Sequence, residues 1–229
     1  MPKLPANQND FHHSLQDVAV EQACKIQNEL RTKVLASDAF KQIQFVGGAD
    51  VGYFKSRTRL QAAVVVLTFP ELELHEFVTS QAACSFPYVP GLLSFRETPA
   101  VLTCLERLKQ PPDLLLCDGQ GVAHPRRFGL ACHLGVLSGL PTIGVAKSRL
   151  IGTHAPLSPE KGSSVPLVDK GETVGLVVRT RAHVKPVYVS VGHKISLPTA
   201  KAWVLRCVTK FRLPETTRLA HRYASNFTS

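Results

Sequence analysis

Residues 114–118 read Leu-Leu-Leu-Cys-Asp, and this short run decides the fold class. Pro111 and Pro112 stand before it, and Gly119 follows it directly. A short, continuous apolar run between such residues is typical of a strand that is buried on both faces. Because helices must cover both faces of such a strand, the run indicates an α/β fold.

Further strands are expected on both sides of this run. Upstream, residues 43–50 and 62–69 are apolar, and a turn at residues 70–71 leads into residues 72–79. Three such neighbours predict an antiparallel meander. Downstream strands are expected at residues 142–145, 173–179 and 187–191. The order of elements predicts a mixed sheet, in which an antiparallel meander feeds parallel strands, flanked by helices.

Helices are expected between the strands. Apolar residues recur at helical spacing from Leu15 to Val34, which predicts a first amphipathic helix. Thr98 and Pro99 have the composition of an N-cap and a first helical turn, so Glu97 is expected just before a second helix. Two more helices are expected at residues 129–137 and 199–210. The Ser- and Pro-containing residues 155–170 are expected to form a long surface loop.

Length and cysteine usage bound the organisation of the chain. Its 229 residues are enough for one sizeable α/β core, so we expect a flexible arm at residues 1–13 and a single domain at residues 14–229. The six cysteines lack CxxC spacing and are expected to be reduced thiols. No apolar stretch approaches the roughly 20 residues that cross a bilayer, and no signal peptide is recognisable. The expected compartment is the cytoplasm.

Charge points to the class of partner. Lys and Arg number 27 against 17 Asp and Glu, which gives a formal net charge of +10. A basic surface attracts polyanions through the release of counterions, so nucleic acid is the natural partner. The alternative is a basic protein that is merely well solvated.

Three carboxylates are placed where elements begin or end. Asp50 and Asp118 each close an apolar strand, and Glu97 stands at a helix start, so the three are expected to meet at one edge of the sheet. Neighbouring carboxylates repel each other unless they are protonated or bridged by a metal, and Mg²⁺ prefers oxygen ligands. Such a metal activates water and neutralises charge on a scissile phosphate. The alternative is that each is an ordinary turn residue.

Two loops have the composition of a nucleic-acid site. In residues 118–121 (DGQG), two glycines follow an acidic strand end, where the backbone either bends sharply or lets a base approach closely. In residues 86–91 (FPYVPG), two prolines stiffen the turn around Tyr88, and a rigid aromatic side chain can wedge into a base stack. A plain β-turn and a surface turn with a packed tyrosine are the alternatives.

Cationic side chains lie near these loops. His124 is followed by Arg126 and Arg127, whose guanidinium groups suit phosphate oxygens. Lys147 ends an apolar strand, where it can hold a phosphate or stabilise developing charge. The alternative for both segments is ordinary solvated charge.

Five segments together resemble the endonuclease V family. They are GADVG at 48–52, PYVPG at 87–91 continuing through FRE at 95–97, DGQG at 118–121 with HPR at 124–126, GVAK at 144–147, and RLPETTR at 212–218. The likeness spans about residues 45–221, and the motifs occur in the order of the family. It implies a ribonuclease H-like fold and a metal-dependent endonuclease in DNA repair, a deoxyribonuclease V. Such enzymes cleave the second phosphodiester bond 3′ to deoxyinosine and leave 3′-hydroxyl and 5′-phosphate ends.

The resemblance also assigns roles to residues. Asp50, Glu97 and Asp118 are implied as metal ligands, with His221 and Lys147 completing the catalytic set. The implied substrate-binding residues are Tyr88, Pro90, Gly91, Leu93, Gly119, His124 and Leu150. Among these, Tyr88 belongs to a strand-separating wedge, and Gly91, Leu93, Gly119 and Leu150 form the pocket for an everted hypoxanthine. Lys147 and His124 would contact the substrate near the cleavage point.

The implied cofactor is Mg²⁺, with Mn²⁺ tolerated, and the implied partner is DNA containing deoxyinosine. The expected mechanism is an in-line hydrolytic attack, with Asp50 and Asp118 holding the ion and Glu97 completing its shell. We expect a monomer that does not bind membranes. Two alternatives remain: an endonuclease for inosine-containing, edited RNA, and a non-catalytic nucleic-acid-binding module. The three carboxylates argue against the second, because negative charge facing phosphate requires a metal.

Overall fold

The structure is a computed structural model, and it describes residues 15, 18–54 and 58–227. The predicted arm at residues 1–13 lies outside the described residues. The strands are β1 (Phe45–Tyr53), β2 (Arg59–Thr68), β3 (Leu74–Ala83), β4 (Leu114–Cys117), β5 (Thr142–Ala146), β6 (Ser164–Asp169), β7 (Glu172–Val178) and β8 (Val187–His193). The helices are α2 (Val20–Leu30), the 3₁₀ turn η1 (Arg31–Lys33), α3 (Leu93–Arg107), α4 (Leu130–Ser138), α5 (Leu197–Arg206) and α6 (Glu215–Ser225).

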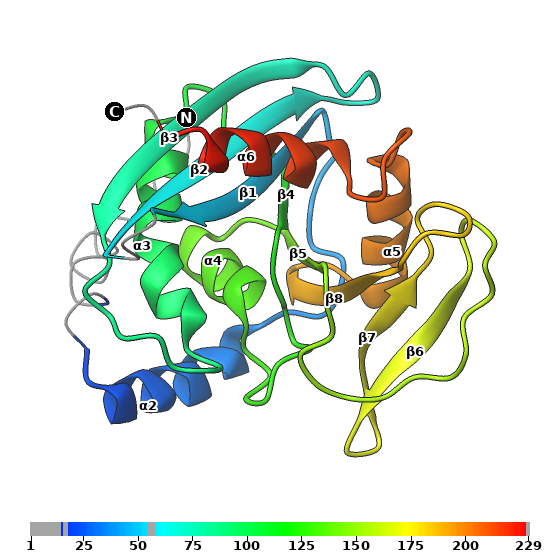
Figure 1. Ribbon diagram of the computed structural model, residues 1–229, viewed down its shortest axis with the longest axis horizontal. Coiled ribbons are helices and arrows are strands. Elements are labelled where there is room, and N and C mark those ends of the chain that lie inside the picture. Colours follow the sequence, from blue (N-terminus) through cyan, green and yellow to red (C-terminus); the bar gives the residue numbers. More distant parts are fainter. Residues whose placement is uncertain (1–14, 16–17, 55–57, 228–229) are drawn as a thin grey trace.

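The strands form one eight-stranded mixed sheet in the order β3-β2-β1-β4-β5-β8-β7-β6 (Figure 1). Strands β1, β2 and β3 are an antiparallel meander, with Asp50 opposite Ala63. Strand β4 runs parallel to β1 and to β5, and the remaining pairs are antiparallel. The predicted mixed sheet, with a meander that feeds parallel strands, is therefore confirmed.

Both faces of the sheet are covered by helices, as the apolar run of β4 predicts. Leu115 and Cys117 belong to one core cluster, which α2, α3 and α4 complete. Leu114 and Leu116 belong to a second cluster, which α5 completes. Helix α6 lies across β1 and β2 on the face away from α3 and α4 (Figure 1). Burying a leucine completely contributes about 1.5–3 kcal/mol, so this central strand anchors both layers.

The second helix begins earlier than predicted. Helix α3 starts at Leu93, so Thr98 is not its N-cap, and Glu97 lies inside the helix rather than before it. Pro99 is also inside, where it cannot donate a hydrogen bond to the carbonyl group of Phe95. The buried face of α3, which includes Val101 and Leu102, holds the helix together across this position.

Three other expectations need correction. Residues 155–170 are not one long loop, because β6 pairs with β7 along the edge of the sheet. Asp50 does not close its strand, since β1 continues to Tyr53. The last predicted helix, at residues 199–210, is α5 at Leu197–Arg206, and α6 follows it without having been predicted.

Two expectations about the chain as a whole can be compared with the structure. All six cysteines are free, and four of them are buried, as expected for reduced thiols. Among the described residues, no helix combines the length and the apolar character that a membrane span requires.

Candidate active site

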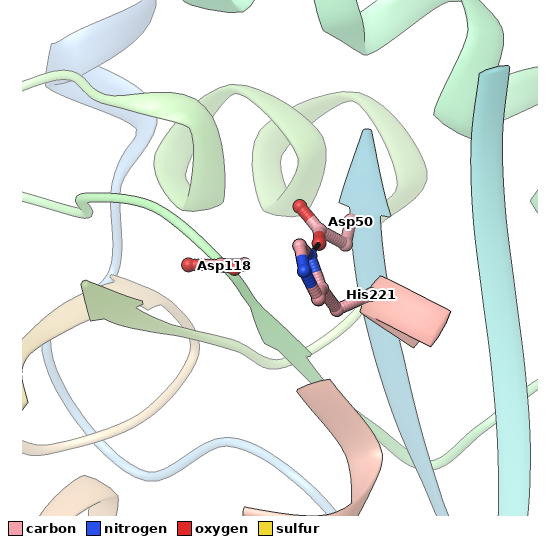
Figure 2. A group of neighbouring side chains, drawn as sticks. All are labelled: Asp50, Asp118 and His221. Carbon is pink, nitrogen blue, oxygen red and sulfur yellow. Dashed lines mark hydrogen bonds and ion pairs between the residues drawn. The ribbon is translucent and has the colours of Figure 1, made fainter. Parts of the chain in front are cut away.

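Asp50 and Asp118 lie side by side because β1 and β4 are parallel neighbours. The register pairs Ala49 with Cys117, and the amide of Asp118 donates a hydrogen bond of 2.9 Å to the carbonyl of Ala49. The residue after each of these two therefore emerges at the same place on the sheet. Asp50 and Asp118, together with His221, offer ligand atoms that all lie within 4.8 Å of one another (Figure 2).

Helix α6 brings His221 to this pair by lying directly on β1. Gly48 and Gly52 flank Asp50 on the strand face beneath the helix, where a Cβ atom at Gly48 would lie 2.1 Å from the carbonyl oxygen of Thr216. A Cβ at Gly52 would lie 2.4 Å from that of Ala224. The absence of side chains at both positions lets the helix backbone approach the strand. His221 Nδ1 is consequently 2.6 Å from Asp50 Oδ2 (Figure 2).

The two aspartates form a strained electrostatic pair. Burial and, to a smaller extent, the nearby charge of Asp118 raise the pKa of Asp50 to about 6, although Lys147 and His221 act in the opposite direction. Two crowded carboxylates favour a divalent cation between them, because the cation removes their repulsion. The two carboxylates supply the oxygen ligands that Mg²⁺ prefers, and the imidazole is a further donor of the kind that transition metals take, so the group can hold a divalent ion.

Glu97 lies near this group without belonging to it. Its side chain is buried in α3 and accepts a hydrogen bond of 2.9 Å from the hydroxyl of Tyr53. Burial, together with the charges of Asp50 and Asp118, raises the pKa of Glu97 to about 8, although the hydrogen bond from Tyr53 acts in the opposite direction. The structure thus joins two of the three predicted carboxylates with His221 and places the third within reach of their electric field. Tyr53 was missed, because it follows the GADVG motif and carries no charge.

Lys147 follows β5 and forms an ion pair with Asp118. Its backbone is held by Arg212, whose Nη2 donates hydrogen bonds to the carbonyl groups of Lys147 (2.6 Å) and Pro186 (2.7 Å). Arg212 belongs to the fifth motif, but the sequence indicated no role for it. The structure therefore links that motif to the ammonium group beside Asp118.

A pocket of about 440 Å³ opens next to the carboxylates. All seven predicted substrate-binding residues line it: Tyr88, Pro90, Gly91, Leu93, Gly119, His124 and Leu150. Glu97, Asp118 and Lys147 line it as well, whereas Asp50 and His221 do not. Ser94, Gln120 and Arg149 complete parts of the wall and had not been singled out. Segments separated by more than sixty residues thus meet around one cavity, from Tyr88 to Leu150.

The side chains around this pocket differ in exposure and charge. Tyr88 is 71% exposed, which leaves its ring free to contact a ligand. His124 is buried. Its Nδ1 accepts a hydrogen bond from the amide of Arg126, so its Nε2 is the nitrogen that donates to the carbonyl of Gly91. Burial lowers the pKa of His124 to about 4, so its ring is neutral near pH 7. Arg127 pairs with Asp169 and Glu172.

A sequence model of one family matches most of this chain. The model describes endonuclease V, and the match covers residues 28–222. The chain belongs to the endonuclease V family. It is a nuclease of the hydrolase class. Endonuclease V enzymes are metal-dependent, and this member carries an Asp-Asp-His group that can hold a metal.

Individual endonuclease V proteins are similar over nearly the whole chain. Endonuclease V of Rippkaea orientalis is 57% identical over 211 residues, which cover 91% of this chain and 91% of the relative. The crystal structure of endonuclease V from Streptomyces avermitilis has a TM-score of 0.86 and 46% identity, covering 90% of this chain and 92% of that one. The fold is ribonuclease H-like, as the resemblance implied.

A third endonuclease V structure includes nucleic acid. The Ciona intestinalis protein was solved in complex with a 23mer DNA that contains an inosine followed by a ribo-adenosine. It has a TM-score of 0.79 and 34% identity to this chain, covering 90% of this chain and 97% of that one.

Proposed function

We propose that this chain is a deoxyinosine-directed endonuclease of DNA repair that uses Mg²⁺, with Mn²⁺ tolerated. It cleaves the second phosphodiester bond 3′ to the deoxyinosine. The observation that carries the proposal is that the pocket lies directly against the candidate metal site: Asp118 belongs to both, and its ion-pair partner Lys147 and the neighbouring Glu97 also line the 440 Å³ pocket. A base held in that pocket keeps its own strand next to the carboxylates. The inosine-containing DNA bound by the Ciona relative supports this substrate class.

The pocket has the features that an extruded purine requires. Its volume lies in the range of roughly 300–1,000 Å³ that is usual for small-ligand sites. Leu93 and Leu150 contribute exposed apolar side chains to its lining, and Gly119 adds a residue without a side chain. Tyr88 is the exposed aromatic residue of the lining. We assign it to the wedge that fills the stack when the base leaves, since extrusion costs least at a weakly paired base.

Asp50, Asp118 and His221 would hold the metal, and Glu97 would complete its surroundings from α3. A divalent ion at this position activates water and neutralises charge on the scissile phosphate. Lys147 lies beside Asp118, where its ammonium group stabilises the negative charge that grows on the phosphate oxygens. Arg212 keeps Lys147 in place through the backbone.

Hydrolysis of this bond forms one phosphorus–oxygen bond, breaks another and moves one proton. A water molecule gives up a proton as its oxygen bonds to phosphorus, and the bond from phosphorus to O3′ breaks with its electron pair on the leaving oxygen. That oxygen takes up a proton and becomes the 3′-hydroxyl, while the phosphate stays on the 5′ end.

The test uses end-labelled strands of one sequence that carry deoxyinosine, inosine, deoxyuridine or deoxyadenosine at one position. With Mg²⁺ present, we expect one cut, at the second phosphodiester 3′ to deoxyinosine, and little cutting of the deoxyuridine and deoxyadenosine strands. Faster cutting of the ribonucleotide strand would instead favour an RNA substrate. Equal cutting of all strands would contradict the proposal. As a control variant, Glu160→Gln changes an exposed carboxylate away from the pocket and should cut the same strands as the wild type.

We further propose that residues 14–229 act as one catalytic domain and that the protein is a monomer. Its six free cysteines are compatible with the reducing cytoplasm. Size-exclusion chromatography with light scattering measures the molar mass directly. A mass of 25.0 kDa supports the monomer, and twice that value contradicts it.

A further inference from the structure

A buried glutamine in the first described helix reaches the wall of the pocket. Gln27 lies on α2 and is fully buried. Its Nε2 donates to the carbonyl groups of Gly91 and Phe128, each at 3.1 Å, and its Oε1 accepts a hydrogen bond from Nε of Arg126. Gly91 lines the pocket, and Phe128 precedes two further lining residues, Gly129 and Leu130. One side chain therefore connects two walls of the same cavity.

The carbonyl oxygen of Gly91 is the point where these bonds converge. It accepts hydrogen bonds from Gln27 Nε2 (3.1 Å), His124 Nε2 (3.0 Å) and Arg126 Nη2 (2.7 Å). A carbonyl oxygen has two lone pairs, so three donors hold it more firmly than a loop carbonyl is usually held. The orientation of the peptide group after Gly91 is thereby fixed.

This carbonyl belongs to the turn that presents the proposed wedge. The amide of Leu92 donates to the carbonyl of Val89 at 2.9 Å, Pro90 occupies the second position, and Gly91 has a φ of +80°. These are the features of a type II turn, in which the third position requires glycine. Tyr88 immediately precedes the turn, so the position of Gly91 determines where the exposed ring stands.

We propose that Gln27 is a positioning residue for lesion recognition. It sets the separation between the turn at residues 89–92 and the wall at residues 129–130, and it acts through Gly91 rather than by touching the base. This inference rests on the proposed function, since it assumes that the pocket receives the extruded purine. Neither glutamate nor methionine can replace Gln27, because only an amide both donates to the two carbonyl groups and accepts from Arg126.

The test compares two substitutions of Gln27 with a packing control on the same helix. Gln27→Met removes all three hydrogen bonds, and Gln27→Glu removes the two donated ones while its carboxylate still pairs with Arg126. Leu30→Val trims a buried side chain of α2 that does not line the pocket. For each protein, kcat and KM are measured on deoxyinosine and deoxyadenosine strands with Mg²⁺, together with the melting temperature.

In both Gln27 variants, the preference for deoxyinosine over deoxyadenosine is expected to fall roughly ten-fold. This is the effect expected from the loss of about one net hydrogen bond. The loss should appear mainly as a higher KM for the deoxyinosine strand, with kcat changed by less than about three-fold. Leu30→Val should lower the melting temperature and keep the wild-type preference.

Other outcomes separate this inference from the proposed function. If Gln27→Met does not fold, Gln27→Glu still decides, because it keeps the shape and the contact with Arg126. If the folded variants are less stable yet retain the wild-type preference, Gln27 supports stability only and the inference is overturned, while the proposed function stands. If the wild-type protein itself shows no preference, the proposed function fails and the inference fails with it.

Discussion

Glu97 is a buried carboxyl group, and without a bound metal the protein stabilises its charged form poorly. Its pKa is raised from the ordinary 4.5 to about 8, so near pH 7 the folded state binds a proton that the unfolded chain has released. Where the folded state binds more protons, stability falls as pH rises, here between about pH 4.5 and pH 8. A divalent ion beside Asp50 and Asp118 would reverse the effect by favouring the ionised form.

Glu97→Gln is therefore expected to stabilise the protein when metal is removed. In EDTA at pH 7, the free energy of unfolding should rise by about 2–3 kcal/mol, and the gain should disappear near pH 4.5. The variant should also lose cleavage, because the amide cannot replace a carboxylate near the metal. Urea unfolding at several pH values measures the first effect. A variant that is less stable than the wild type at pH 7 would contradict the pKa assignment.

Tyr88 is the second residue whose environment predicts a measurable effect. A residue that is 71% exposed contributes little to the fold, so Tyr88→Ala should leave the melting temperature nearly unchanged. It should lower the preference for deoxyinosine over deoxyadenosine by roughly ten-fold, since stacking on an aromatic side chain contributes about 1–3 kcal/mol per base. Leu74→Ala, which trims an exposed apolar side chain outside the pocket, is the control. Unchanged preference in Tyr88→Ala would exclude the wedge.

At the level of secondary-structure elements, the contact between β1 and α6 determines how close His221 lies to Asp50. Gly48→Ala would place a methyl group 2.1 Å from the carbonyl oxygen of Thr216, so the helix must move away from the strand. We expect a loss of about 1–3 kcal/mol in stability. The cleavage rate should fall on the order of 100-fold, because an ångström-scale displacement separates His221 from Asp50. Wild-type activity in this variant would show that α6 need not lie so close.

The central strands were predictable because each is a continuous apolar run in the sequence. The elements that were missed or misplaced lack such a pattern or carry a misleading one. The buried face of α6 consists of small or polar residues such as Thr216, Ala220 and Ala224, so it lacks the large apolar side chains that indicate a helix. Strand β6 lies at the sheet edge, where only Leu167 is buried. The start of α3 was misplaced because Thr98 and Pro99 imitate a helix start, while packing of Phe95 extends the helix beyond it.

On the scale of the whole molecule, the parallel neighbours β1, β4 and β5 bring Asp50, Asp118 and Lys147 together. The sequence predicted Asp50, Asp118 and Lys147 because each follows or lies within an apolar run, and the topology brings these three strands together. The geometry of His221 could not be predicted, since it depends on an approach of α6 that only two glycines permit. The hydrogen bonds from Arg212 to Lys147 and from Tyr53 to Glu97 could not be predicted either, because they also depend on tertiary packing.

The net charge of +10 also belongs to this scale. If the protein binds the phosphates of its substrate, counterions are released on binding and affinity falls with salt. Between 50 and 200 mM salt we expect KM for the deoxyinosine strand to rise on the order of ten-fold or more, while kcat at saturating substrate stays nearly constant. A KM that is independent of salt would indicate that the basic surface does not contact the strand.

The central claim is that Asp50, Asp118 and His221 form a metal centre that cuts the strand held in the neighbouring pocket. Single-turnover cleavage of a deoxyinosine strand, measured as a function of Mg²⁺ for the wild type and for Asp118→Asn, tests it most directly. We predict that the wild-type rate rises from background in EDTA to a plateau, and that Asp118→Asn stays at background at every concentration while still binding the strand. Wild-type cleavage in EDTA, or a normal rate in Asp118→Asn, would contradict the account.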